Sequence, residues 1–316
     1  MLDISHVTKR YRRRTGAVLA NDDVSLRLGA GEVVGLLGHN GAGKTTLVNQ
    51  IVGLAAPTSG RITLDGHDLV AQPALARRLV SLQPQGQVPL DGITPRQAIE
   101  LLGRLRGGGA ATVRRRTTEL IAALDIEEWA TTVGNRLSGG VRRLVGFCMA
   151  AVVPGRLVTL DEPTNDVDPV RRTALWSLVR RLGDEGHAVL LVSHNVAEVE
   201  RAVDRLVVLD RGRVVAEGTP SALKARVSNP LRLQILLAPG VPVPEAPYGE
   251  PSTLDGRWWR LHVAELDVAP AVAWARDLAA AGTALEFSLT PTSLEDVYVE
   301  LVGGRTVDRE GVEVVV

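Results

Sequence analysis

The chain has 316 residues, enough for one large domain and a smaller one, and its 45% hydrophobic content is ordinary for a globular protein with a sizeable core. Lys plus Arg and Asp plus Glu number 36 each, so the zero net charge predicts no overall electrostatic attraction to nucleic acid or to an anionic membrane. No apolar run approaches a bilayer span and a single cysteine excludes an internal disulfide framework, so we expect a soluble, cytoplasmic protein.

The first part of the chain leads into a glycine-rich loop. Residues 1–30 alternate short apolar stretches with turn residues, which predicts paired antiparallel strands. An apolar run over 33–37 predicts a buried strand, and residues 44–52 carry apolar positions at helical spacing. Between these two elements stands Gly38-His39-Asn40-Gly41-Ala42-Gly43-Lys44-Thr45, a complete GxxxxGKT phosphate-binding loop.

Such a loop holds a polyphosphate through its main chain. Its glycines let successive N–H groups point inward, and the N-terminus of the following helix adds a partial positive charge. Lys44 would reach the β- and γ-phosphates, and the Thr45 hydroxyl would ligate Mg²⁺. The alternative, a glycine-rich turn that binds nothing, is disfavoured by the strand and helix on either side.

A helical region follows, from about residue 84 to 150. Thr94-Pro95-Arg96-Gln97 is a capping box that begins one helix, and three glycines at 107–109 end it. Leu137-Ser138-Gly139-Gly140 precedes a further helical stretch and is a second candidate anion site. Taken alone this tetrapeptide is weak evidence, because Ser-Gly-Gly before a helix is also an ordinary N-cap.

Charged and polar side chains then follow two predicted strands. Residues 157–160 predict a buried parallel strand that ends in Asp161 and Glu162, at the edge where α/β proteins place ligand sites. His194 follows the strand predicted over 188–192. A charged strand exit and a structural histidine are the alternatives for these residues taken alone. The alternation of strands and helices continues to about residue 228, which predicts an α/β fold.

The remainder of the chain predicts a linker and a second domain. Six prolines fall within residues 229–251, which indicates a semi-extended linker. Beyond it, strand, helix, strand and helix patterns predict a small α+β unit. We therefore expect a nucleotide-binding domain over 1–228, a Pro-rich linker over 229–251 and a C-terminal accessory domain over 252–316.

Taken in order, these elements resemble the nucleotide-binding subunit of ATP-binding-cassette (ABC) transporters over residues 1 to about 228. The resemblance implies a P-loop NTPase fold with an antiparallel β subdomain and a helical insertion. It rests on six motifs in the family's order: the phosphate loop, Gln85 in Leu82-Gln83-Pro84-Gln85, the signature Leu137-Ser138-Gly139-Gly140, the acidic pair Asp161-Glu162, the dimer-contact loop Asn165-Asp166-Val167-Asp168, and the switch histidine His194.

The resemblance also implies a role for each residue. Glu162 would be the general base, His194 would contact the γ-phosphate, and Asp161 would organise Mg²⁺ through water. Gln85, with Gln83 as its rival, would sense the metal and the nucleophilic water. Tyr11 stands where the family places an aromatic side chain against adenine. The expected site has Glu162, His194, Lys44 and Gln85 for catalysis, Thr45, Gln85 and Asp161 for Mg²⁺, and Tyr11, Gly38, Asn40, Gly41, Gly43, Lys44, Thr45, Thr46, Ser138, Gly139, Gly140 and Asp168 for ATP.

Two partners follow from the resemblance. The signature faces away from its own phosphate loop in this family, so it should close on ATP bound to a second copy of the chain. A separate transmembrane permease should carry the substrate path, which implies a location at the cytoplasmic face of the membrane and no nucleic-acid partner. Within the family, Glu162-Pro163-Thr164-Asn165, the Pro-rich segment and Ser293-Leu294-Glu295-Asp296-Val297-Tyr298 most resemble the daunorubicin-resistance type of bacterial drug-export ATPase.

Two residues depart from the family's pattern. Val141 replaces a glutamine that commonly ends the signature, and Asp166 replaces a usual glycine of the dimer-contact loop. Neither change removes a group that performs chemistry, so an active hydrolase is expected. The alternatives are a soluble ABC ATPase that acts on nucleic acid or ribosomes, and a P-loop kinase or GTPase without a role for Ser138 or His194.

Overall fold

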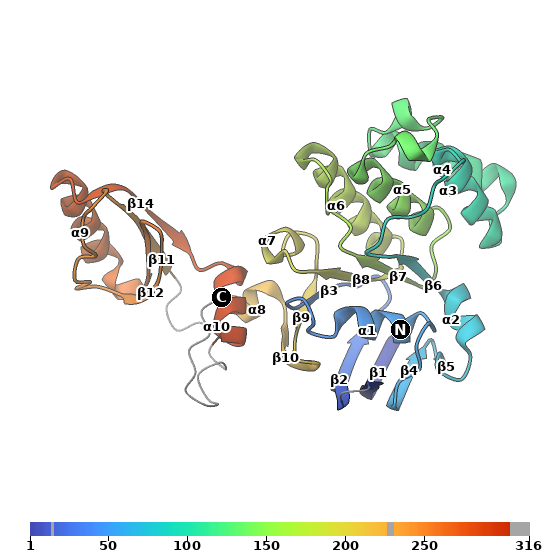
Figure 1. Cartoon of the computed structure of the whole chain (residues 1–316), viewed down its shortest axis with the longest axis horizontal. Coiled ribbons are helices and arrows are strands. Elements are labelled where there is room, and N and C mark those ends of the chain that lie inside the picture. The colour runs from blue at the N-terminus through green and yellow to red at the C-terminus, as the bar shows by residue number, and fades with distance from the viewer. Residues whose placement is uncertain (14–15, 226–230, 304–316) are drawn as a thin grey trace. The chain divides into compact units, whose positions relative to one another are not determined.

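The computed structural model describes residues 1–13, 16–225 and 231–303. These residues form two compact units, and the boundary between the units in the sequence falls between Glu217 and Gly218 (Figure 1). The N-terminal unit covers residues 1–217. The C-terminal unit covers the described residues from 218 onward. Within the described residues, no helix has the length and apolar character needed to cross a bilayer.

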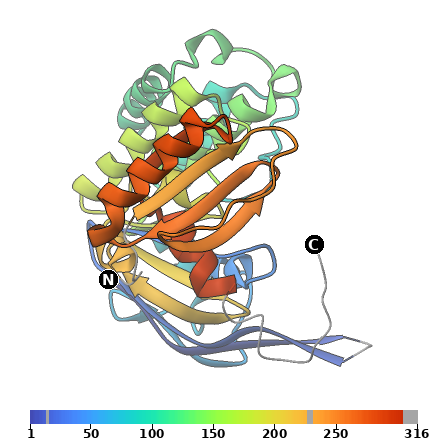
Figure 2. The same ribbon diagram turned by 90° about the vertical axis from the view of Figure 1, so that its left-hand side faces the viewer.

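The N-terminal unit contains a four-stranded antiparallel sheet with strand order β2-β1-β4-β5. Its strands are β1 (Leu2–Arg13), β2 (Gly16–Leu28), β4 (Ser59–Leu64) and β5 (His67–Asp68). Strand β1 pairs with β2 on one side and with β4 on the other. The long β1 and β2 strands run side by side at the foot of Figure 2, which confirms the antiparallel subdomain.

A six-stranded sheet with strand order β10-β9-β3-β8-β7-β6 forms the second layer. Neighbours from β9 to β6 pair in parallel, so their carboxyl ends share one edge. Strands β3, β7 and β8 are buried along their whole length, as the continuous apolar runs predict. The strands are β3 (Val33–Leu37), β6 (Val80–Gln83), β7 (Leu157–Asp161), β8 (Ala188–Ser193), β9 (Arg205–Asp210) and β10 (Arg213–Gly218).

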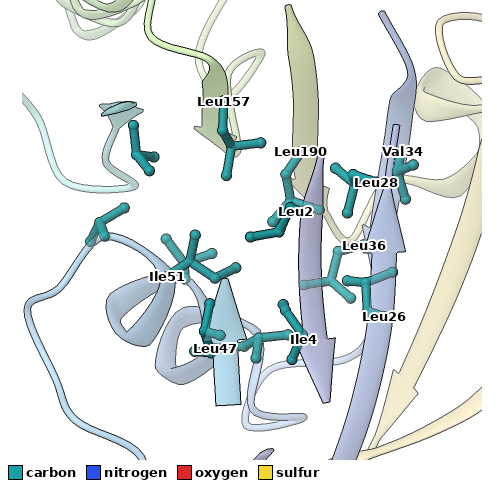
Figure 3. Close-up of a cluster of buried hydrophobic side chains, with 14 of the residues drawn as sticks. Leu2, Ile4, Leu26, Leu28, Val34, Leu36, Leu47, Ile51, Leu157 and Leu190 are labelled. Atoms are coloured by element: carbon teal, nitrogen blue, oxygen red, sulfur yellow. The ribbon is translucent and has the colours of Figure 1, made fainter. Parts of the chain in front are cut away.

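The core of this unit lies between the two sheets and helix α1 (Lys44–Ile51) (Figure 3). Each of the three elements contributes side chains that are buried from solvent, so the start of α1 is held firmly beside the carboxyl end of β3. The labelled side chains of this cluster are Leu2, Ile4, Leu26, Leu28, Val34, Leu36, Leu47, Ile51, Leu157 and Leu190.

The predicted helical insertion comprises α3 (Pro95–Leu105), α4 (Ala110–Ala123) and α5 (Gly139–Ala151). The capping box is present, because the Thr94 hydroxyl accepts from the Gln97 backbone at 3.3 Å and the Gln97 side chain accepts from the Thr94 backbone at 2.9 Å. The other helices of the unit are α2 (Pro73–Leu79), α6 (Pro169–Asp184) and α7 (Val196–Val199).

The C-terminal unit has its own antiparallel sheet, with strand order β12-β13-β11-β14. Helix α9 (Val268–Ala280) covers one face, where Ala271 and Ala275 pack against buried side chains of β11 and β13 (Figure 2). The unit's strands are β11 (Leu231–Leu237), β12 (Glu250–Asp255), β13 (Trp258–Val263) and β14 (Ala284–Pro291), and its other helices are α8 (Pro220–Lys224) and α10 (Leu294–Gly303).

The expected Pro-rich linker over residues 229–251 is wrong in part, because strand β11 lies within it. Residues 231–237 lie inside the stretch that the prolines marked as a connection over 229–251, yet they form a central strand of the sheet. The physical reason is that no proline falls between Pro230 and Pro239, and Leu233, Ile235 and Leu237 alternate with other residues so that one face is buried. The proline content was averaged over 23 positions, so the seven-residue strand without proline was not recognised.

Candidate nucleotide site

The phosphate loop joins β3 to α1, as the sequence predicts. Gly43, with φ of 104°, adopts a left-handed conformation directly before the helix, and a Cβ there would overlap the Ala20 carbonyl oxygen. A Cβ on Gly38 would lie 2.5 Å from the Leu209 carbonyl oxygen. The loop is therefore packed between β2 and the end of β9, and glycine is required at both positions.

Lys44 is the cation of this loop. Its Nζ donates to the carbonyl oxygens of Gly38 at 2.5 Å and His39 at 3.1 Å, so the side chain curls back over the loop. Burial lowers the pKa of Lys44, and the nearby carboxylates of Glu162 and Asp161 oppose that shift. A positive charge is thus held in place where a phosphate would bind.

A cavity of about 420 Å³ opens over the loop and is lined by nine of the predicted site residues, whereas Gly38 and His194 are not part of its lining. Its lining residues come from the phosphate loop and beyond, and they carry the Lys44 ammonium, two threonine hydroxyls, two side-chain amides and two carboxylates. This donor set fits the phosphates of a nucleotide with a bound Mg²⁺. The lining residues named by the sequence analysis are Asn40, Gly41, Gly43, Lys44, Thr45, Thr46, Gln85, Asp161 and Glu162, and the ones it missed are Val18, Leu19, Ala20 and His39.

The acidic pair lies at the carboxyl end of β7. Asp161 is buried, and that burial, together with repulsion from Glu162, raises its pKa to about 6 against the attraction of Lys44 and Arg143. Among the residues that the structure describes, no three His, Cys, Asp or Glu side chains cluster as a metal site. The Thr45 hydroxyl and the Asp161 carboxylate are oxygen ligands of the kind that Mg²⁺ takes together with phosphate and water.

Glu162 and His194 form a bonded pair. Oε1 of Glu162 accepts from the His194 backbone at 2.9 Å and from the His194 ring Nδ1 at 2.6 Å, while Oε2 accepts from the Ser193 hydroxyl at 3.0 Å. Glu162 has φ of 49°, an uncommon conformation for a residue with a side chain. Since a carboxylate accepts at Nδ1, the His194 Nε2 is the ring nitrogen left for a ligand.

The signature and the dimer-contact loop lie together, and neither lines the cavity. Ser138 is the N-cap of α5 and accepts from the Val141 backbone at 3.3 Å. A Cβ on Gly140 would overlap the Asp166 carbonyl oxygen, so the two segments are in close contact. Asp166 has φ of 63°, which explains why glycine suits this position. Asp168 caps α6, and the Arg171 backbone hydrogen bond lowers the pKa of its carboxyl.

Comparison with known proteins identifies the family. Residues 21–165 match the ABC transporter family. The daunorubicin/doxorubicin resistance ATP-binding protein DrrA of Streptomyces peucetius is 38% identical over 217 residues, which are 68% of this chain and 66% of that protein. Daunorubicin resistance ATP-binding protein DrrA2 of Streptomyces coeruleorubidus is 34% identical over 310 residues, 95% of this chain and 96% of that protein. The chain belongs to the ABC transporter family.

A third relative and two solved structures agree. Nod factor export ATP-binding protein I of Paraburkholderia xenovorans is 32% identical over 309 residues, 97% of this chain and 98% of that protein. An ATP-binding subunit of an ABC transporter aligns with a TM-score of 0.66 and 28% identity, over 72% of this chain and 92% of that one. A dimeric ATP-binding cassette in a post-hydrolysis state with ADP and Pi aligns with a TM-score of 0.64 and 26% identity. The alignment covers 69% of this chain and 98% of that one. The predicted ABC ATPase fold is confirmed.

In this ABC ATPase the two candidate glutamines are in different places. Gln85 lines the cavity, whereas Gln83 is buried in β6 and its Nε2 donates to the Arg143 carbonyl oxygen at 3.1 Å. Gln85 is therefore the glutamine that faces the cavity, and Gln83 packs beneath α5.

Tyr11 does not itself line the cavity of the ABC cassette. It lies on β1 opposite Val18, which does, and the Lys9 ammonium sits 4.8 Å from its ring centroid. The ring is thus one strand away from the apolar wall that Val18 and Leu19 form, and its contact with adenine stays a prediction.

Proposed function

We propose that this chain is the ATP-hydrolysing subunit of an exporter. Two copies would close on Mg·ATP at the cytoplasmic face of the membrane and power a separate permease that expels drugs or other hydrophobic compounds. The observation that carries the proposal is the gathering of Lys44, Asp161 and Glu162 around one cavity, with the signature outside it. The names of the relatives, which refer to daunorubicin resistance and to export, support the direction and class of transport.

Residues around the cavity supply the groups that would carry out the chemical step. Lys44 and the loop N–H groups would bind the phosphates, and Thr45 and Asp161 would hold Mg²⁺, which supplies charge neutralisation when bound. Glu162 would take the proton of the attacking water, with Gln85 positioning that water. The hydrogen bond from the His194 ring Nδ1 to Glu162 orients the imidazole and leaves Nε2 for the γ-phosphate, to which Nε2 would donate when the ring is the imidazolium.

A second copy of the chain would complete the site. Ser138, Gly139 and Gly140 are outside the cavity in their own chain, and the N-terminus of α5 carries backbone N–H groups suited to phosphate. Closure of one signature on the other copy's ATP would give two equivalent sites. Because Gly140 of the signature contacts Asp166, the dimer-contact loop would lie in the same interface.

The permease would dock in a groove on the N-terminal unit. A depression of about 220 Å³ is lined by residues of α2, β6, α3, α5 and the segment after α1. Leu54, at its edge, is 63% exposed, and Leu105 on the same helix as the lining residue Leu102 is 74% exposed. Strand β6 leads from this groove to Gln85 in the nucleotide cavity, so an occupant of the groove would act on the ATP site through that strand.

Replacing Leu54 by Glu is expected to abolish co-purification of the permease while ATP hydrolysis by the isolated subunit is kept. The side chain is largely exposed, so the charge is tolerated in the free chain but would lose its water when the permease covers the groove. The measurement is pull-down of the tagged chain from detergent-solubilised membranes, with mass spectrometry of the bound proteins. Leu266→Glu is the matched control, because Leu266 is 95% exposed on the C-terminal unit.

This pull-down also separates the proposed function from its rival. Recovery of a polytopic membrane protein with the wild-type chain, and its loss with Leu54→Glu, supports the exporter subunit. Recovery of ribosomes or nucleic acid without a membrane protein would instead support a soluble ABC ATPase and would overturn the proposal. The zero net charge of the chain already disfavours that rival.

Replacing Tyr11 by Ala is expected to weaken ATP binding about tenfold, because stacking on an aromatic ring contributes about 1–3 kcal/mol per base. Tyr11→Phe keeps the ring and should bind almost as wild type. Calorimetric titration with Mg·ADP measures both affinities. Equal affinities for the Ala variant and the wild type would remove Tyr11 from the adenine site and leave Val18 and Leu19 as its apolar wall.

A further inference from the structure

His39, within the phosphate loop, makes two hydrogen bonds whose partners are both acceptors. Its Nδ1 lies 2.7 Å from the carbonyl oxygen of Asn40, and its Nε2 lies 2.9 Å from Oδ1 of Asp210. Asp210 ends β9 and is 7% exposed, whereas the His39 side chain is 44% exposed and lines the nucleotide cavity. The two residues are 171 positions apart in the sequence.

The chemistry of these partners assigns the protons. A carbonyl oxygen cannot donate, so Nδ1 carries a hydrogen. An ionised carboxylate cannot donate either, so Nε2 also carries one. With Asp210 ionised, both bonds form together only when His39 is the imidazolium cation. Loss of one proton would set a nitrogen lone pair against an acceptor and would change the net charge of the pair from zero to minus one.

The segment that bears Asp210 is attached to the phosphate loop at other points. The Gly212 backbone donates to the Ala42 carbonyl oxygen at 2.9 Å, and Gly38 has no room for a Cβ beside the Leu209 carbonyl. The residues Leu209 to Gly212 therefore pack against the phosphate loop. The His39–Asp210 hydrogen bond attaches the partly exposed His39 side chain to the same segment.

The other charged groups near His39 come from four elements. Lys44 of α1 donates to the His39 carbonyl oxygen, and Asp161, which ends β7, and the following Glu162 line the same cavity. Arg213, the first residue of β10, is paired with Asp22 of β2. In the part of the chain that the structure describes, Asp210 is the acidic side chain hydrogen-bonded to the His39 ring.

We propose that Asp210 holds His39 as an imidazolium, and that this cation strengthens binding of the nucleotide's phosphates in a pH-dependent way. The inference rests on the proposed nucleotide site and adds a positioning pair to it. The sign follows from the charges: phosphates favour the protonated pair over the pair with net charge minus one, so nucleotide affinity should fall as pH rises and His39 loses its proton. Histidine is the side chain whose charge changes most readily between pH 5 and 8.

The test compares the full-length wild type with two variants, His39→Asn and Asp210→Asn. Mg·ADP affinity is measured by calorimetry at pH 6.0 and pH 8.5, and ratios between proteins remove the titration of ADP itself. At pH 6.0 wild type should bind about 3- to 10-fold more tightly than His39→Asn, and this advantage should vanish at pH 8.5. Asp210→Asn should bind more tightly than wild type at pH 8.5, because the uncompensated negative charge is gone.

A second measurement needs no nucleotide. Long-range proton–nitrogen spectra of the wild type report the protonation of each imidazole, and His39 is assigned by its absence in His39→Asn. Both nitrogens should carry hydrogen at pH 6.0. A neutral ring with hydrogen on Nδ1 alone at every pH would overturn the inference, as would equal affinity losses for both variants at both pH values. Failure of all proteins to bind Mg·ADP would instead contradict the proposed function.

Discussion

Replacing Glu162 by Gln is expected to slow ATP turnover about 10²–10⁴-fold while ATP binding is retained. The amide cannot take the proton of the attacking water, but it has nearly the shape of the carboxylate. Its oxygen can still accept from the His194 backbone and ring, and the Ser193 hydroxyl can turn to accept from the new amide nitrogen. The loss should therefore fall on the chemical step and not on folding.

Steady-state phosphate release and calorimetric binding of Mg·ATP separate these two effects. Asp184→Asn serves as the matched control, since Asp184 is an exposed carboxylate on α6 that pairs with Arg180. The control should hydrolyse ATP at the wild-type rate. Retention of more than a tenth of the wild-type turnover by Glu162→Gln would show that another group acts as the general base.

Replacing Ser138 by Asp is expected to abolish turnover, whereas Ser138→Asn should keep a substantial part of it. Both side chains can cap α5 as serine does, so the helix should be preserved in either variant. The aspartate, however, would bring a negative charge against the γ-phosphate of the partner's ATP. We expect a loss of at least about 10²-fold for the aspartate variant in phosphate release.

Mixing variants tests whether the signature acts on a second copy. Ser138→Asp keeps an intact phosphate loop, and Lys44→Ala keeps an intact signature, so a mixed dimer has one complete site. An equal mixture of these two inactive proteins should recover about a quarter of the wild-type rate if the sites are independent. Full activity of Ser138→Asp alone would rule out the signature's role, and an inactive mixture would count against action between copies.

Much of the phosphate site could be predicted because its chemistry requires fixed local spacing. The loop places Lys44 and Thr45 at a strand-to-helix junction, and the carboxyl edge of parallel strands brings Asp161 and Glu162 to the same place. Helix α6 was missed although Asp168 and Pro169 give a start signal and Leu175, Val179 and Leu182 recur at helical spacing. The arginines between these positions make the apolar face of the helix hard to recognise in the sequence.

Contacts between distant segments could not be predicted from one sequence. Nothing in the spacing of His39 and Asp210, or of Glu162 and Ser193, indicates that they bond, because the sheet order that joins them is a property of the fold. The choice between Gln83 and Gln85 likewise depended on where β6 ends. Strand β11 was concealed by neighbouring prolines, although its alternation of buried positions was present in the sequence.

Sedimentation of Glu162→Gln with and without Mg·ATP tests whether two copies of the chain close on ATP. Blocked hydrolysis should trap the closed state, so the variant should sediment at twice the 33.7 kDa mass of a single chain with Mg·ATP and as a monomer without it. Adding Ser138→Asp to the same protein should return it to the monomer. A variant that binds Mg·ATP and remains a monomer at high concentration would show that ATP does not close two copies into a dimer.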